Sequence, residues 1–232
     1  MKLLVTRPQG ERTAAALRAR GHDPLLAPLL RIEPIDVDLA GTFVAVVLTS
    51  VNAARALATH SQRAELTKLP MFAVGQRSAQ AAREIGFENV TSADGDITDL
   101  AGLIVERVGE GTLLYLAGED RAGDLAGDLA GHGLDVRTAV VYRAVPAPTL
   151  PEPARASIVT GKIDGVLHYS RRSAETFVDC ARVAGLLEPA LTLGHYCLSE
   201  QVAGPLRAAG AAKVRSAARP DEAALFDLLD RP

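Results

Sequence analysis

Short apolar segments alternate with longer alanine-rich segments along the whole chain, and turns of Ser, Thr, Gly or Asn separate them. The repeated unit is clearest in LLVTRPQGERTAAALRARG, VVLTSVNAARAL, MFAVGQRSAQAAREIG, LLYLAGEDRAGDLAGDLAGHG, GVLHYSRRSAETFVDCARVAG and HYCLSEQVAGPLRAAG. Strands that alternate with helices of this length predict βαβ units and a parallel sheet. Strands such as VAVVL are apolar throughout, as expected when helices cover both faces of the sheet.

The chain also resembles itself at two different offsets. The segment from Ser50 to about Leu103 resembles the segment from Ser170 to about Leu228, and the N-terminal unit resembles residues 113–146. These offsets predict an α/β fold of two similar parallel-sheet, flavodoxin-like domains joined by a two-stranded extended connector. Domain A would take residues 1–33 and 148–232, domain B residues 38–140, and the connector residues 34–37 and 141–147. We expect a cleft between the domains, which is a common location for a ligand.

Composition narrows the class of protein. A chain of 232 residues with 48% hydrophobic residues is long enough for two small cores. The net charge of −3 argues against non-specific attraction to nucleic acid or to an anionic membrane. No apolar run approaches the length of a membrane span, and the N-terminus does not resemble a signal peptide. We therefore expect neither a nucleic-acid partner nor a membrane partner.

Cysteine and histidine usage bears on compartment and metals. Cys180 and Cys197 are the two cysteines and have no CxxC spacing, which fits a cytoplasmic protein and argues against a disulfide framework or a zinc site. The five histidines are scattered without an i,i+4 pair. We expect neither a metal nor a cofactor.

The turns after the predicted strands supply the candidate binding groups. Ligands of open parallel sheets lie beyond the carboxyl ends of the strands, where free N–H groups at helix N-termini bind anions. Ser50, Ser78, Ser170 and Ser199 are candidate N-caps of the following helices, and capping alone would explain each of them. Six such turns on one cleft would nevertheless suit a ligand with many negative groups.

Motifs for other chemistries are missing from the sequence. It has no GxGxxG after the first strand, no GxxxxGK[ST] and no GxSxG, which removes the main support for dinucleotide, nucleoside triphosphate and hydrolase functions. Candidate acids and bases near the turns are also few. The residues by themselves thus predict a two-domain α/β protein with an anion-binding cleft, suited more to binding and shaping than to acid–base catalysis.

The order of these segments resembles the uroporphyrinogen-III synthase family over essentially the whole length. The resemblance is carried by LLVTRP, LTSVNA, VGQRSA, the GEDR turn, VVYRAV, YSRRSA and CLSEQVA, together with the interrupted first domain. It implies two α/β domains on a two-stranded connector, no cofactor, and an active site in the cleft. It also implies the substrate hydroxymethylbilane, a linear tetrapyrrole with eight carboxylates, which loses water and cyclises to uroporphyrinogen III with its last pyrrole inverted. Much of that chemistry belongs to the substrate, so the enzyme would act mainly by orientation.

The family's roles can be carried over only to matching residues. The connector tyrosine falls on Tyr142, whose phenol can donate a hydrogen bond to the departing hydroxyl; the alternative is an aromatic side chain that only packs the connector. The turn threonine of the family is matched by Ser78. The other candidate substrate-binding residues are Arg7, Ser50, Asn52, Arg77, Ser170, Arg171, Arg172, Ser199 and Gln201. LSEQVA departs from the family's glycine turn with threonines, and Glu200 is an unusual neighbour for a carboxylate, so roles at that turn stay open.

Two other functions are compatible with these features. A non-catalytic tetrapyrrole or small-anion binding protein would keep the cleft without the chemistry, and a sugar-phosphate enzyme could use the same kind of cleft. The first expectation remains a cytoplasmic hydro-lyase of tetrapyrrole (heme-type) biosynthesis, acting as a monomer.

Overall fold

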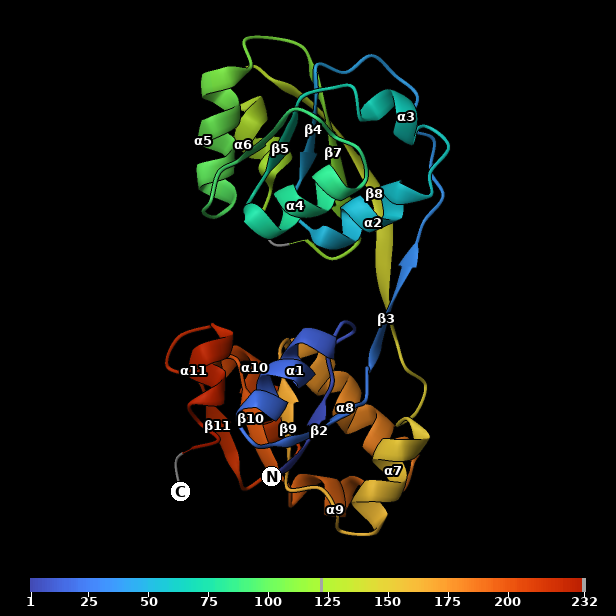
Figure 1. Cartoon of the computed structure of the whole chain (residues 1–232), viewed down its shortest axis with the longest axis vertical. Coiled ribbons are helices and arrows are strands. Elements are labelled where there is room, and N and C mark those ends of the chain that lie inside the picture. The colour runs from blue at the N-terminus through green and yellow to red at the C-terminus, as the bar shows by residue number, and fades with distance from the viewer. Residues whose placement is uncertain (122, 231–232) are drawn as a thin grey trace. The chain divides into compact units, whose positions relative to one another are not determined.

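The computed structural model describes residues 1–121 and 123–230, and it is an α/β protein with two mostly parallel sheets (Figure 1). This confirms the predicted α/β class with two similar sheets, while the two-stranded connector stays a prediction. Contacts divide the chain into two compact units, Met1–Arg31 with Val145–Pro232, and Ile32–Ala144. They are called here the discontinuous unit and the continuous unit. Residues 122 and 231–232, which the expected domains include, lie outside the described residues.

The discontinuous unit is built on a five-stranded sheet in the order β11-β10-β9-β1-β2. Its strands are β1 (Lys2–Val5), β2 (Asp23–Leu26), β9 (Gly165–His168), β10 (Gly194–Cys197) and β11 (Val214–Ser216). Its helices are α1 (Glu11–Ala19), α7 (Glu152–Val159), α8 (Arg171–Val183), α9 (Leu187–Leu191), α10 (Glu200–Ala208) and α11 (Glu222–Phe226). Alternation along β1 sends Leu4 into a core with α7–α10, and Leu3 and Val5 into a second core with α1 and α11.

The continuous unit carries a six-stranded sheet in the order β3-β8-β7-β4-β5-β6. Its strands are β3 (Leu30–Pro34), β4 (Ala45–Leu48), β5 (Met71–Ala73), β6 (Val90–Ser92), β7 (Thr112–Gly118) and β8 (Asp135–Pro146). Its helices are α2 (Val51–Ala58), α3 (Arg63–Leu66), α4 (Gln76–Glu84), α5 (Ile97–Arg107) and α6 (Leu125–Ala130). Helices α2–α4 pack on one face of the sheet and α5 and α6 on the other.

The internal resemblance of the sequence corresponds to a repeated topology. The order β11-β10-β9-β1-β2 matches β6-β5-β4-β7-β8 strand for strand. The pairing registers agree as well, since Leu3 pairs with Gly165 in one sheet and Leu113 with Ala45 in the other. Equivalent positions in the two units can therefore be compared directly.

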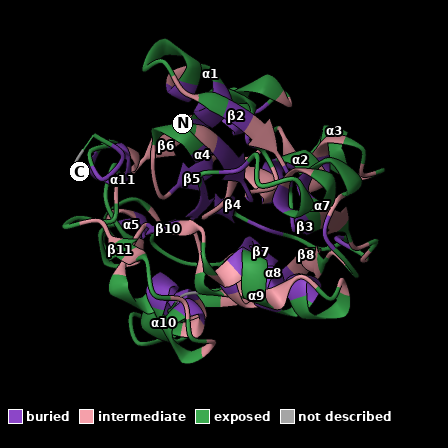
Figure 2. Cartoon of the chain, turned by 90° about the horizontal axis from the view of Figure 1, so that it is seen from below, coloured by how far each residue is buried: buried purple, intermediate pink, exposed green. Residues whose placement is uncertain are grey.

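Burial follows the expected pattern in both units. Figure 2 shows buried residues concentrated in the sheets and on the inner sides of the helices. In α10, for example, Val202, Ala203 and Leu206 are buried while Glu200 and Arg207 are exposed. This one-sided burial is why alanine-rich segments with periodic apolar residues form helices here.

Candidate functional site

A cavity of about 480 Å³ lies at the carboxyl edge of the sheet in the continuous unit. It is lined by Thr49, Ser50, Val74, Asp96, Ile97, Tyr115, Gly118, Asp120, Arg121, Gly123 and Tyr142. These residues come from the ends of β4, β5 and β7, from β8, and from the segments that lead into α2, α5 and α6. The volume falls within the range of about 300–1,000 Å³ that is usual for small-molecule sites.

Tyr142 lies on β8 and reaches this cavity because the strand pairing changes register beside it. Ala117 of β7 pairs with Val140, whereas the next residue, Gly118, pairs with Tyr142. The Glu119 backbone N–H donates to the Tyr142 carbonyl oxygen at 3.0 Å, which holds the strand in place after the irregularity. The Tyr142 ring is half-buried, so its phenol is accessible from the cavity.

Two further hydroxyls in the cavity wall were not singled out from the sequence. Thr49 Oγ1 and the Tyr115 hydroxyl are 2.9 Å apart and form a hydrogen bond. Tyr115 is largely buried in β7, and Thr49 directly follows β4. The alternation of LLYLAG would place Tyr115 on one face of its strand, but its partner comes from 66 residues away. Only the pairing of β4 with β7 brings the two side chains together.

The turn between β4 and α2 behaves as the sequence predicts. Ser50 is the N-cap of α2, and its hydroxyl accepts from the Asn52 backbone N–H at 3.1 Å. Ser50 also lines the cavity, so the capping role and a binding role can coexist. Asn52 lies in the first turn of the helix and is half-buried.

The prediction that Ser78 caps its helix is wrong. Helix α4 begins earlier, with Gly75 as the N-cap, and the Ser78 backbone N–H donates to the Gly75 carbonyl oxygen at 3.0 Å. The Ser78 side chain is buried, and Arg77 is exposed. Because no side chain caps α4, its first N–H groups have no side-chain acceptor of the capping type, and a Cβ placed on Gly75 would meet no atom within 4 Å. This helix end is thus better suited to an anion than Ser78 itself.

The N-terminus of helix α5 lies at the same edge of the sheet and is capped by side chains of the chain itself. Asp96 caps it by accepting from the Thr98 and Asp99 backbone N–H groups, and the Asp99 carboxylate accepts from the Asp96 N–H at 2.8 Å. These backbone hydrogen bonds, first that of Asp99, lower the pKa of Asp96. The α5 end therefore already holds an anion of the chain itself, and it is a poor candidate for a ligand carboxylate.

In the discontinuous unit, Arg7 is engaged in a polar cluster. Its guanidinium lies 3.1 Å from Glu222 Oε1 and 4.5 Å from the centre of the Tyr169 ring, and the Thr13 hydroxyl donates to Glu222 at 2.5 Å. Burial acts to raise the pKa of Glu222, but Thr13 and the guanidiniums of Arg7 and Arg12 outweigh it and lower that pKa. Arg7 is therefore already ion-paired within the chain, and a substrate carboxylate would have to compete with Glu222 for its guanidinium.

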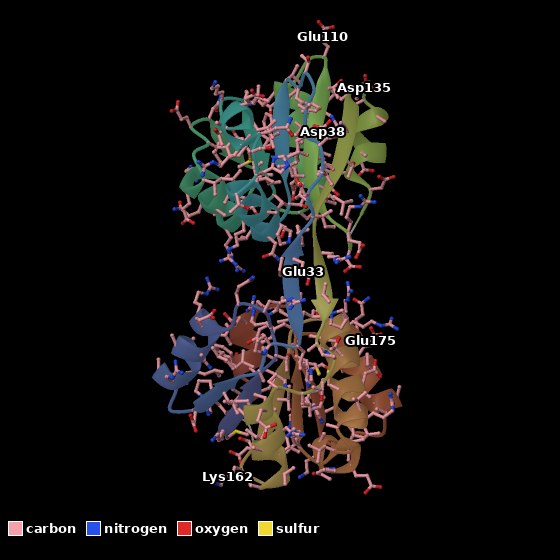
Figure 3. The ribbon with its side chains drawn as sticks, turned by 90° about the vertical axis from the view of Figure 1, so that its right-hand side faces the viewer. Glu33, Asp38, Glu110, Asp135, Lys162 and Glu175 are labelled. Carbon is pink, nitrogen blue, oxygen red and sulfur yellow. The ribbon has the colours of Figure 1, made fainter. Side chains whose placement is uncertain are left out.

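Ser170 caps α8 as predicted. Its hydroxyl accepts from the Ser173 N–H at 3.1 Å, and the Ser173 hydroxyl accepts from the Ser170 N–H, which makes a capping box. Arg171 is exposed and forms an i,i+4 ion pair at 2.9 Å with Glu175. Figure 3 labels Glu175 on the discontinuous unit. Arg172 lines a separate cavity of about 260 Å³ with Glu175.

Ser199 and Gln201 lie at the start of α10. Ser199 occupies the N-cap position but makes no side-chain capping bond, so that part of the expectation is wrong. Gln201 is exposed and shares a cavity of about 460 Å³ with Arg171 and Glu200. Glu200 is ion-paired with Arg207, which explains how a carboxylate is tolerated at this turn. The Ser199 and Gly75 backbones have the same φ and ψ, −160° and 170°, so α4 and α10 begin alike.

A buried histidine pair was also missed from the sequence. His168 Nε2 and His195 Nδ1 are 3.1 Å apart, both side chains are fully buried, and the Phe177 ring packs against both edge-on. Burial holds the pKa of His168 well below its usual value, helped by His195, and burial lowers the pKa of His195 to about 4. Their separation of 27 residues carries no signal, because only the pairing of β9 with β10 brings them together.

The structure thus brings the predicted residues together in separate sets. Ser50 and Tyr142 line one cavity of the continuous unit, and Arg171 and Gln201 line one cavity of the discontinuous unit. Arg7 and Arg172 belong to neither set. Within residues 1–121 and 123–230, no group of three or more His, Cys, Asp or Glu side chains is placed to hold a metal ion. The same residues include no helix that is long and apolar enough to cross a membrane.

Comparison with known proteins places these features in a family. The profile described as uroporphyrinogen-III synthase HemD matches residues 11–227. A uroporphyrinogen-III synthetase from Helicobacter pylori is similar in structure, with a TM-score of 0.69, 19% identity, and coverage of 99% of this chain and 98% of that chain. A mutant uroporphyrinogen III synthase from the extremely thermophilic bacterium Thermus thermophilus has a TM-score of 0.56, 20% identity, and coverage of 100% and 98%.

No curated protein matches the sequence. At these identities the solved structures show a shared fold, whereas the profile covers nearly the whole length. The chain therefore belongs to the uroporphyrinogen-III synthase family.

Proposed function

We propose that this chain cyclises hydroxymethylbilane to uroporphyrinogen III, with loss of water and inversion of the last pyrrole. The observation that carries the proposal is the phenol of Tyr142 on the wall of a cavity, in a chain that belongs to this family. The reaction is a step of tetrapyrrole biosynthesis. Its proposed compartment is the cytoplasm, because Cys180 and Cys197 are free thiols.

Tyr142 is the proposed catalytic residue. In the first step, the bond between the terminal carbon and its hydroxyl breaks as the pyrrole nitrogen supplies the electrons, and the hydroxyl takes the phenol proton and leaves as water. The phenolate regains a proton when the last pyrrole loses the hydrogen of its free α-carbon at ring closure. A hydrogen bond donated by the phenol stabilises the leaving oxygen as it gains negative charge. The cationic terminus is then attacked by the substituted carbon of the last pyrrole, and the resulting spiro intermediate rearranges.

The aromatic and aliphatic parts of the cavity serve a second need. The cationic intermediate reacts with water or closes without inversion unless it is held in one conformation. Val74, Ile97 and Tyr115 offer apolar surface for pyrrole rings, while the Thr49–Tyr115 hydrogen bond keeps the Tyr115 ring in one orientation. Catalysis by orientation needs few acid–base groups.

The substrate carboxylates need separate binding groups. We assign them to the first N–H groups of α4 and α10, which no side chain caps, and to nearby Arg77 and Arg171. Ser50, Asn52, Ser78, Ser170, Arg172, Ser199 and Gln201 remain candidate contacts. Arg7 can contribute only if a substrate carboxylate competes with Glu222. The proposed site holds no metal or cofactor.

The test is an isomer assay with purified protein and freshly generated hydroxymethylbilane. We expect the type III isomer to accumulate faster than the type I isomer, which forms spontaneously. A chain that binds uroporphyrinogen III but leaves the product as type I is the binding protein of the alternative hypothesis. A chain that is stabilised against heat by sugar phosphates and not by the tetrapyrrole would be the sugar-phosphate enzyme of the second alternative.

A further inference from the structure

Gly118 lies directly beneath the reactive end of Tyr142. If a Cβ atom were added to Gly118, it would lie 2.6 Å from Tyr142 Cζ, 2.7 Å from the hydroxyl oxygen and 2.9 Å from Cε2. Separations under 3.0 Å are too short for such atoms, so one group would have to move. The phenol end of the side chain therefore rests on the backbone of Gly118.

Glycine is required at position 118 because a side chain there would clash with Tyr142, and not because the backbone adopts a conformation that only glycine tolerates. Several glycines of the chain have positive φ, Gly123 and Gly133 among them, but Gly118 does not. Because the φ of Gly118 is not positive, the lack of a side chain matters here for the space it leaves to the neighbouring Tyr142 ring.

The surrounding backbone limits which group can yield. Gly118 ends β7 opposite Tyr142, just after the register shift, and Ala117 and Val141 beside them are buried in the two cores of the unit. The Glu119 N–H bond to the Tyr142 carbonyl oxygen joins the strands on the far side. An added methyl group would thus move the half-buried ring rather than the strands. Bulges commonly aim a side chain into a site, and here the glycine completes that effect.

We propose that Gly118 is a positioning residue, whose missing side chain sets where the Tyr142 hydroxyl lies in the cavity. The proposal rests on the proposed function for its kinetic consequence, but not for its structural one. Gly118 itself contributes no reacting group. It acts only through Tyr142, and this distinguishes it from a general packing position.

The kinetic test is Gly118→Ala in the full-length chain. Displacement of a catalytic group by roughly 1 Å costs on the order of a hundredfold in rate, so we expect kcat for type III formation to fall by about tenfold to a hundredfold with KM little changed. The matched control is Gly102→Ala in α5, where an added Cβ meets no atom within 4 Å and activity should match the parent. A Gly118→Ala variant as fast as the parent would overturn the proposal.

A double-variant cycle separates positioning from general damage. When Tyr142 is already Phe, no hydroxyl remains to be misplaced, so Gly118→Ala should cost less than about twofold further. An equal loss in both backgrounds would show that Gly118 acts by another route. If Gly118→Ala alone lowers the unfolding midpoint, adding Tyr142→Leu should restore it, because the shorter side chain ends before the contact. Failure to restore it would place the clash elsewhere.

A spectroscopic test does not depend on activity. The chain has four tyrosines, so ¹³Cζ-labelled tyrosine gives few signals, and the Tyr142→Phe spectrum assigns the one from Tyr142. Gly118→Ala should shift that signal, while those of Tyr169 and Tyr196 in the other unit stay in place. An unshifted Tyr142 signal would refute the positioning role even in an active enzyme. A parent chain that makes no type III isomer would refute the proposed function and leave this test intact.

Discussion

The two units have the same strand order but different carboxyl edges. In the continuous unit, β7 ends in Ala117 and Gly118, and a cavity of about 480 Å³ lies beside them. In the discontinuous unit, the registers place Arg7 and Pro8 at the equivalent positions. The Arg7 guanidinium reaches Glu222 and covers the Tyr169 ring there. The shared topology therefore provides the edge, and the side chains decide whether the space beyond the end of β7 or of β1 is open or filled.

A second difference lies inside the sheets. His168 and His195 of the discontinuous unit are equivalent by register to Leu48 and Met71 of the continuous unit. All four side chains are buried, but only the histidine pair can titrate. The sheet of the continuous unit thus has no ionisable side chain at these positions, while the sheet of the discontinuous unit carries two buried ionisable side chains.

The largest effect should come from separating the units. A fragment of residues 32–144 has its own sheet and two cores, and we expect it to unfold cooperatively. It keeps Tyr142 but lacks Ser170, Arg171 and Ser199, so it should form no type III isomer and bind uroporphyrinogen III poorly. Circular dichroism, calorimetry and the isomer assay test these points. A fragment that still makes the type III isomer would show that the discontinuous unit is dispensable.

The variant Tyr142→Phe tests whether the cavity of the continuous unit is the catalytic site. Loss of one acid–base contribution predicts a fall in turnover of roughly a hundredfold to ten-thousandfold with the fold intact. Tyr169→Phe, in the closed edge of the other unit, is the matched control and should change turnover far less. Steady-state rates and thermal unfolding of both variants give the answer. Equal rates for the parent and the Tyr142→Phe variant would show that Tyr142 has only a packing role.

The histidine pair should make the discontinuous unit sensitive to acid. Both folded pKa values lie below the unfolded value of about 6.5, so the native state binds fewer protons. The stability from the neutral pair is complete above the unfolded pKa of about 6.5 and is lost as the pH falls, for His195 toward its folded pKa of about 4.

Replacing both histidines with the residues at the equivalent positions of the other sheet should remove the sensitivity of the stability to acid. His168→Leu with His195→Met installs the residues of the other sheet and should flatten the pH dependence of the unfolding free energy between pH 7 and pH 5. His132→Gln, at an exposed position, is the control and should leave the slope unchanged. Either single change in the pair strands a buried polar group and should cost about 1–3 kcal/mol. A double variant that keeps the parental slope would show that other groups cause the acid sensitivity.

The smallest effect should come from opening the closed edge. Glu222→Gln removes the charge that pairs with Arg7, and we expect a loss of about 1 kcal/mol, or roughly 2–4 °C in Tm. Because the folded pKa of Glu222 is lowered, its contribution is present above the unfolded value and is lost as pH falls through the folded one. Asp179→Asn breaks an exposed pair with Arg182 and should change Tm less. Calorimetry that ranks the two variants in the opposite order would contradict this account.

Local sequence rules predicted some parts of the site correctly and others wrongly. Ser50 and Ser170 cap their helices as expected, because a serine after a buried strand can accept the first helical N–H groups. Ser78 does not, because Gly75 takes an extended conformation and starts α4 three residues earlier. Glycine gives no side-chain signal for a cap, so a nearby serine was the more visible candidate.

The sequence by itself determined the parallel α/β class, the repeated units and the residues that follow each strand, because these depend on local periodicity and on the order of segments. Only the tertiary structure decided that Gly118 lies under Tyr142, that Thr49 bonds Tyr115, and that His168 meets His195. Each of those contacts joins different strands. Strand pairing and register set them, and a single-residue shift like that at Gly118 moves a side chain without leaving a trace in the local pattern.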